Sequence, residues 1–288
     1  MDTLLLEAFV TVAETSSFST TAEQLHLTQS AVSKRIALLE QQLDCRLFDR
    51  IARTVSLTES GKELLPRARH ILRELDATRQ AIADLSGSVA GTLKLAISHH
   101  IGLRRLPPVL KTFTQQYPKV HLDVAFMDSE QAYDSVLHGH DELALITLTS
   151  TPHSKIVSVP VWNDPLSFVC APDHPLTSEP PLLQNLEKFP AILPELNTYT
   201  GQIVSELFEN QKLTLNVAMT TNYLETIKGM VSSGMGWSVL PDTMIDQSIS
   251  AMAISKHSLE RQLGYIHHRD KTLSNAANAF IQLLHSKD

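Results

Sequence analysis

Gln29, Ser30, Ser33 and Lys34 are the first residues of this sequence whose types suggest chemistry. They follow Thr28 in the run TQSAVSK. Amide and hydroxyl groups of this size can hydrogen-bond the edges of bases, and a lysine can pair with a phosphate. Thr28, Gln29, Ser30, Ser33 and Lys34 are therefore candidates for binding double-stranded DNA. The alternative is that they form the solvated face of an ordinary surface helix.

The apolar residues around this run predict three short helices that would position it. The first spans about residues 3 to 14, the second can be capped by Ser19 or Thr20, and the third has Thr28 as its N-cap. A very short turn joins the second helix to the third, which is the arrangement of a helix-turn-helix. The apolar stripes are Leu5, Phe9 and Val12, then Ala22 and Leu25, and finally Val32, Ile36, Leu39 and Leu43.

Positive residues are concentrated next to these helices although the whole chain is acidic. The formal net charge is −7, so a DNA interface must depend on local geometry and not on bulk charge. Val55 and Leu57 alternate with polar residues in the segment that follows, which predicts a small β wing. Arg50 and Arg53 on this wing are candidates for holding phosphates.

A set of residues within the first 61 positions carries a resemblance to a known family. The set is Ala22, Leu25, LTQSAVS from Leu27 to Ser33, Ile36, LLE from Leu38 to Glu40, LFDR from Leu47 to Arg50, Arg53, and LTESG from Leu57 to Gly61. It resembles the LysR-type transcriptional regulators. Asp44 departs from the pattern, because the family usually has glycine at this helix end; aspartate tolerates a left-handed backbone better than most residues.

The resemblance implies a sequence-specific DNA-binding transcriptional regulator. Residues 1–58 would form an N-terminal all-α winged helix-turn-helix, followed by a long linker helix. The family implies no enzymatic activity and no cofactor, and RNA polymerase is a further candidate partner.

The linker helix is predicted over residues 59–85. Its apolar positions are alternately four and three residues apart, which is the seam of a coiled coil and needs a partner helix. We therefore expect a homodimer that assembles to a tetramer; packing of the seam against the chain's own domain is the alternative. Pro66 should remove one hydrogen bond and bend the helix. The seam consists of Leu64, Ala68, Ile71, Leu75, Thr78, Ile82 and Leu85.

After a small hinge segment at residues 86–91, the chain alternates between strand and helix patterns. TLKLAI and ELALITL predict strands, and LRRLPPVLKTFTQQYP predicts one helix opened by prolines. This alternation indicates a parallel sheet with helices on its faces. It occurs twice, so two similar α/β lobes with a cleft between them are expected.

The family resemblance continues through residues 92–288 as an effector-binding domain. It implies a two-lobed α/β domain resembling a type 2 periplasmic binding protein, with the chain crossing between lobes near residues 162 and 266. The first lobe would comprise about residues 92–161 and 266–288, and the second about residues 162–265. Trp237 stands where the family usually has a smaller aliphatic residue, and it could fill the core or narrow the cleft.

Polar groups at predicted strand ends and helix starts are candidates for binding a small effector in this cleft. Ligands of α/β sheets bind at the carboxyl ends of strands, and helix N-termini attract anions. We therefore expect a small anionic effector such as a carboxylate. Each serine or threonine could instead cap a helix, and this alternative stays open. The candidates are Ser98, His100, Thr147, Thr149, Asn197, Thr198 and Thr200.

Other functions find little support in the residue patterns. Cys45 and Cys170 lack metal-ligand spacing, and we expect neither a disulfide between them nor a metal site at the histidine pairs. No apolar run approaches the roughly 20 residues of a membrane helix, and the N-terminus lacks a basic leader, so a cytoplasmic protein is expected. No catalytic motif is found. The competing hypothesis is a ligand-binding or enzymatic α/β module whose N-terminal helices only oligomerise it.

Overall fold

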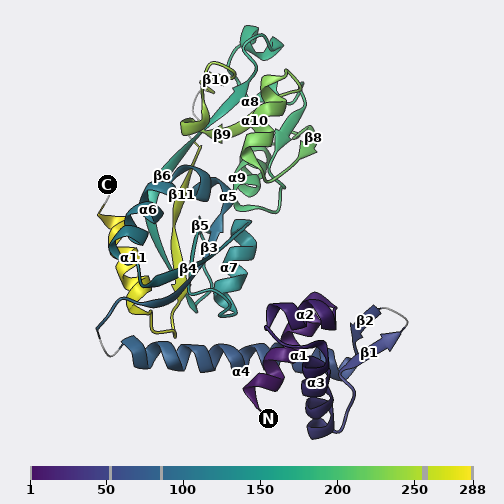
Figure 1. The fold of residues 1–288 in the computed structure, drawn as a ribbon. Coiled ribbons are helices and arrows are strands. Elements are labelled where there is room, and N and C mark those ends of the chain that lie inside the picture. Colours follow the sequence, from purple (N-terminus) through teal and green to yellow (C-terminus); the bar gives the residue numbers. More distant parts are fainter. Residues whose placement is uncertain (1, 52–53, 85–86, 255–258, 287–288) are drawn as a thin grey trace. The chain divides into compact units, whose positions relative to one another are not determined.

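The computed structural model describes residues 2–51, 54–84, 87–254 and 259–286 (Figure 1). The chain forms two compact units, Met1–Ser86 and Gly87–Asp288. Each unit has an apolar core of its own. No helix within the described ranges is long and apolar enough to span a membrane.

The first unit contains the expected helix-turn-helix and wing. Each of its short helices begins after a residue whose side chain accepts a backbone N–H, namely Asp2, Ser17 and Thr28. The prediction that Ser19 or Thr20 caps the second helix is wrong, because that helix begins earlier, at the buried Phe18. The elements are α1 (Thr3–Thr15), α2 (Phe18–Gln24), α3 (Gln29–Leu43), β1 (Phe48–Ile51), β2 (Thr54–Leu57) and α4 (Glu59–Asp84), with β1 and β2 antiparallel.

Turns in the left-handed region separate the elements of this unit. His26, between α2 and α3, has a φ of 53°, and Asp44, at the end of α3, has a φ of 48°. The expectation that Asp44 adopts this backbone is confirmed. The core of the unit is formed by the predicted stripes, since Phe9, Val12, Val32, Ile36 and Leu39 are all 0% exposed.

The predicted seam of α4 divides into two parts. Leu64 and Ala68 pack into the core of the first unit. For this part of the helix, packing of the seam against the chain's own domain is therefore confirmed. Ile71 and Ile82 are 39% and 65% exposed. The dimer prediction therefore depends on the later part of the helix, and Leu85 at its end lies outside the described residues. Pro66 lies inside α4.

The second unit begins with a first lobe of alternating strands and helices. The single helix predicted from LRRLPPVLKTFTQQYP is in fact two helices, because Pro107 cannot continue a preceding helix and instead starts a new one. The elements are β3 (Gly91–Ser98), α5 (His99–Arg104), α6 (Pro107–Gln116), β4 (Val120–Met127), α7 (Ser129–Leu137) and β5 (Leu143–Thr147), completed near the C-terminus by β11 (Leu259–His268) and α11 (Asn275–His285).

The second lobe follows the long strand β6 (Ile156–Cys170). Its further elements are a 3-10 turn (Pro175–Ser178), α8 (Leu183–Leu186), β7 (Ala191–Leu193), α9 (Tyr199–Asn210), β8 (Val217–Thr220), α10 (Leu224–Ser232), β9 (Ser238–Pro241), a second 3-10 turn (Asp242–Met244) and β10 (Ser250–Met252).

A mixed sheet connects the lobes, where a parallel one was expected. Its order is β10-β6-β11-β5-β3-β4, and β9 also pairs with β6. β3 is parallel to β4 and β5, but β11 is antiparallel to both β5 and β6. The sheet is mixed because β6 and β11 carry the chain between lobes in opposite directions. In the second lobe β7 and β8 form a separate parallel pair.

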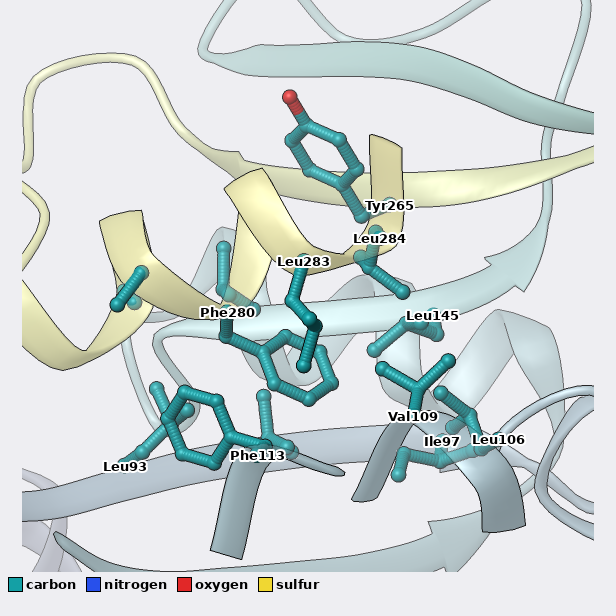
Figure 2. Close-up of a cluster of buried hydrophobic side chains, with 14 of the residues drawn as sticks. Leu93, Ile97, Leu106, Val109, Phe113, Leu145, Tyr265, Phe280, Leu283 and Leu284 are labelled. Carbon is teal, nitrogen blue, oxygen red and sulfur yellow. The ribbon is translucent and has the colours of Figure 1, made fainter. Parts of the chain in front are cut away.

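Two main cores define the lobes. In the first, α11 and α6 bring the Phe113 and Phe280 rings to 5.2 Å (Figure 2). Leu263 belongs to this core and Leu259 to the core of the second lobe, so β11 crosses between these residues, a few positions before the predicted crossing near residue 266. Trp237 fills the second core: it is 0% exposed and stacks on Phe208 at 5.6 Å.

Candidate functional site

The polar face at the start of α3 is exposed, and its own hydrogen bonds order the first turn. The Thr28 hydroxyl accepts the Ala31 backbone N–H at 3.2 Å and lies 3.0 Å from the Ser30 hydroxyl. The opposite face of α3 is buried in the core. Helices that enter the major groove present donors and acceptors from their first turns in this way. Among the predicted residues, Thr28, Gln29, Ser30 and Lys34 are exposed and Ser33 is half-buried.

The β hairpin is tied directly to α3. The Glu40 carboxylate accepts the backbone N–H groups of Leu47 and Phe48, at 2.8 and 3.4 Å. Arg50 lies in β1 opposite Val55 of β2. Arg53 lies outside the described residues.

A pocket in the second unit brings together most of the residues predicted to bind an effector. It contains about 410 Å³ of space, part of it open to solvent. The cavity volume itself is only about 40 Å³, which is room for a few water-sized groups, so a small metabolite would extend through the open side of the pocket. The predicted residues that line the pocket are Ser98, His100, Thr147, Thr198 and Thr200; Thr149 and Asn197 do not. The other lining residues are His99, Asp128, Ser129, Glu130, Pro194, Tyr199, Asn222, Leu224 and Arg261.

The N-terminus of α9 already has its hydrogen-bond partners within the protein. The Thr198 hydroxyl accepts the Gly201 N–H at 3.1 Å and donates to the Glu195 carbonyl at 2.6 Å. The Glu130 carboxylate accepts the Tyr199 N–H at 2.8 Å. Capping therefore accounts for Thr198. The Glu130 carboxylate occupies the N-terminus of α9, where we expected the anionic group of an effector.

Arg261 of β11 is the main residue that the sequence prediction missed. Its Nε donates to Asp164 Oδ2 at 2.8 Å and its Nη1 donates to Thr200 Oγ1 at 2.8 Å. Its side chain is 3% exposed, and that of Asp164 is 4% exposed. A signal was present in the sequence, because Leu259, Arg261 and Leu263 alternate on the inward face of one strand.

Two buried polar atoms at this pocket have no hydrogen-bond partner among the described residues. They are Arg261 Nη2 and Ser98 Oγ. Ser98 occupies the N-cap position of α5 without making the capping bond. A buried polar group left unsatisfied costs about 1–3 kcal/mol. Both atoms can therefore bind a group from outside the chain, either a ligand or an ordered water molecule.

Asp128 and Glu130, at the start of α7, are two further pocket residues that the sequence analysis did not predict, and they connect the first lobe to the second. Asn222 Nδ2 donates to Asp128 Oδ2 at 2.9 Å, and Glu130 reaches Tyr199 as described. The Ser129 hydroxyl accepts the Thr147 N–H at 3.1 Å. The pocket is thus bounded by groups from both lobes.

We predict that stability of the second unit decreases in acid because of His100. Burial, the Arg261 charge and His99 hold the pKa of His100 well below its usual value. In the unfolded chain the pKa of this histidine is about 6.5. As the pH falls below that value, only the unfolded chain binds the proton, so the free energy of unfolding decreases until the pKa of the folded state is reached. Urea unfolding read by tryptophan fluorescence should show a shallower acid loss in His100→Gln. The exposed His121→Gln should keep the wild-type slope, and an unchanged slope in His100→Gln would contradict the prediction.

Metal or redox sensing gains no support from the geometry. Across the described ranges, no three His, Cys, Asp or Glu side chains are grouped to hold a metal ion. Cys45 and Cys170 are both free thiols. Burial raises the pKa of Cys170, which reduces the reactive thiolate form.

Comparison with known proteins identifies the family. Residues 4–62 match the family of bacterial regulatory helix-turn-helix proteins, lysR family, and residues 86–288 match the LysR substrate binding domain. YeiE of Escherichia coli (strain K12), an uncharacterized HTH-type transcriptional regulator, is 32% identical over 96% of this chain and 94% of its own. The HTH-type transcriptional activator CmpR of Synechocystis sp. is 29% identical over 98% and 94%.

A solved structure shows the same fold. Full-length CbnR in complex with its target DNA has a TM-score of 0.72 at 19% identity, covering 100% of both chains. The named relatives are transcriptional regulators and not enzymes, which decides against the enzymatic module. The chain therefore belongs to the LysR family of bacterial regulatory helix-turn-helix proteins, which are DNA-binding transcriptional regulators with a substrate-binding domain.

Proposed function

We propose that this regulator binds operator DNA through the first turns of α3 and is controlled by a small effector with an anionic group in the pocket of its second unit. One observation carries the effector proposal: Arg261 Nη2 and Ser98 Oγ are buried at the same pocket without partners. An oxygen of an anionic group accepts hydrogen bonds from both. Such charge-assisted bonds are shorter and stronger than neutral ones.

The charges behind the pocket favour a single anionic group at this point. Arg105 Nη2 lies 3.7 Å from Asp164 Oδ1, and Arg261 pairs with the other oxygen of the same carboxylate. Two guanidinium groups around one carboxylate leave one positive charge uncompensated. A monoanionic group compensates it.

Regulation requires that DNA binding and effector binding be coupled through an assembly. The exposed Ile71 and Ile82 of α4 support a homodimer through the later part of this helix. A symmetric pair of α3 helices would read two half-sites of one operator. An effector that prefers one arrangement of the dimer or tetramer would shift the regulator between its states. We place this function in the cytoplasm, where the DNA is.

We expect Gln29 and Lys34 to affect DNA binding differently. Gln29→Ala should weaken binding by about 1–3 kcal/mol and relax the preference at particular base pairs, because an amide can read a base edge. Lys34→Ala should weaken binding to all sequences similarly and lower the salt slope by about 1, because we assign this lysine to a phosphate and not to a base. Fluorescence anisotropy with DNA from beside the protein's own gene, at several salt concentrations, measures both. Equal behaviour of the two variants would refute this division, and no sequence-preferring binding by the wild type would refute the operator proposal.

Ser98→Ala tests the position of the effector. Calorimetry of the full chain against a panel of small carboxylates and inorganic anions should find binding that weakens by about 1.5–3 kcal/mol in this variant, because a hydrogen bond to a charged group is lost. Thr149→Ala is the matched control, since Thr149 does not line the pocket. Equal affinities in wild type and Ser98→Ala would place the effector elsewhere.

A further inference from the structure

The charged residues that line the pocket are of both signs. Arg261 supplies the positive group, and Asp128 and Glu130 supply two carboxylates from the start of α7. Arg261 is paired with Asp164 on its other side. Asp128 and Glu130 form no ion pair with any lysine or arginine in the described part of the chain. The pocket therefore has an acidic side whose charge is offset only by the N-termini of α7 and α9 and not by a cationic side chain of the described residues.

The two carboxylates of α7 are held in place but keep hydrogen-bonding capacity. Glu130 Oε1 accepts the Tyr199 N–H, and Asp128 Oδ2 accepts an amide hydrogen of Asn222. The other oxygen of each group accepts no hydrogen bond from the described residues. Each carboxylate can accept up to about four hydrogen bonds, so both remain able to bind a donor.

Ser98 and Arg261 provide the second, independent indication of a ligand. Ser98 is 2% exposed and Arg261 is 5% exposed, and each has a polar atom without a partner at the pocket. These atoms suit an anionic group, whereas Asp128 and Glu130 repel one. A ligand that carries only negative charge satisfies one side of the pocket and is opposed by the other.

We infer that the effector is a small zwitterion with one carboxylate and one ammonium group, the chemistry of an amino acid. The inference rests on the proposed function, from which it takes the carboxylate at Arg261 and Ser98. The ammonium group donates to the unused oxygens of Glu130 and Asp128. It thereby compensates the acidic side of the pocket, and dicarboxylates are disfavoured by the same two residues.

A zwitterion bound in this way connects elements of both lobes. Its carboxylate contacts Arg261, which already holds Thr200 at the start of α9. Its ammonium group contacts Glu130, which already holds the next backbone N–H of that helix, at Tyr199. The two ends of the ligand therefore bind the same two residues that hold the start of α9.

The test compares matched ligands on the full-length protein. Thermal shift and calorimetry are run with the common L-amino acids, with the α-hydroxy acid of each, which lacks the ammonium group, and with the corresponding amines, which lack the carboxylate. We expect at least one amino acid to raise Tm and its hydroxy acid and amine to bind about 10- to 100-fold more weakly, since each loses charged hydrogen bonds.

Isosteric variants assign the ammonium contact. Glu130→Gln keeps an oxygen for the Tyr199 N–H but loses the charge, and it should abolish the preference for the amino acid over its hydroxy acid. Asp128→Asn is a second variant with the same expectation. Glu206→Gln, at an exposed position of α9, should leave the preference unchanged.

The outcomes separate the inference from the proposed function. Hydroxy acids or simple carboxylates that bind as well as amino acids, and lose affinity in Ser98→Ala, would overturn the zwitterion and leave the anion site standing. Binding of an amino acid that Ser98→Ala does not weaken would overturn both. If no amino acid shifts the wild type, the inference is overturned as well.

Discussion

Arg261→Met is expected to destabilise the second unit by about 3–5 kcal/mol, because it leaves the Asp164 carboxylate buried without its main partner. The two side chains are 3% and 4% exposed and join at 2.8 Å. Arg105, at 3.7 Å, remains near the carboxylate and should keep the loss towards the lower end. Urea unfolding followed by tryptophan fluorescence measures the effect in this unit, since both tryptophans of the chain, Trp162 and Trp237, belong to it.

A double substitution separates stability from ligand binding. Arg261→Met combined with Asp164→Leu removes both buried charges and should recover most of the lost stability. It should not recover effector binding, because the guanidinium that we assign to the effector is gone. Arg104→Met is the matched control. Arg104 forms a surface pair with Glu225 at 3.6 Å, and its loss should cost less than about 1 kcal/mol. A double variant as unstable as Arg261→Met would show that the buried pair is not the cause.

Phe9→Ala is expected to destabilise the first unit by about 3–5 kcal/mol and to weaken DNA binding. Phe9 is 0% exposed, and its ring lies 5.4 Å from that of Phe48, where α1 meets the hairpin. Small domains have only about 5–15 kcal/mol of stability, so such a loss leaves the unit that carries α3 with little margin and unfolds up to about half of it where the stability is at the low end of this range. Thermal unfolding by far-ultraviolet circular dichroism and anisotropy with operator DNA measure the two effects.

Leu4→Ala is the control for this substitution on the same helix. Leu4 is 48% exposed, so its truncation should change stability by no more than about 0.5 kcal/mol. Tryptophan fluorescence should report a second unit that unfolds normally in Phe9→Ala, because the two units have separate cores. Full DNA affinity in Phe9→Ala would mean that this core does not support α3 as we describe.

Most of the first unit could be predicted because its determinants are local. Thr28 caps α3 through a bond to a residue three positions away, and Asp44 takes the left-handed turn expected at the end of that helix. The cap of α2 was predicted wrongly because several hydroxyl residues in SSFSTT could serve. The burial of Phe18 selects Ser17 among them, and that burial depends on packing against Phe48.

The effector pocket could be predicted only in part. The rule that ligands bind at the carboxyl ends of strands correctly predicted Ser98, His100 and Thr147, which lie at the ends of β3 and β5 or shortly after them. It missed Glu130, whose contact with Tyr199 joins residues 69 positions apart. Thr149 and Asn197 satisfied the same pattern and do not reach the pocket.

The sequence by itself determined the family, the helix-turn-helix with its caps, and the strands after which polar groups gather, since each depends on neighbours within one or two turns of chain. Only the tertiary structure decided which of those groups already have partners. Arg261 finds Thr200 61 residues away and Asp164 97 residues away, yet retains one nitrogen without a partner among the described residues, at a pocket that Ser98 also lines. Hydrogen-bond satisfaction is a property of segments brought together by folding, so the chemistry of this pocket could not be derived from local spacing.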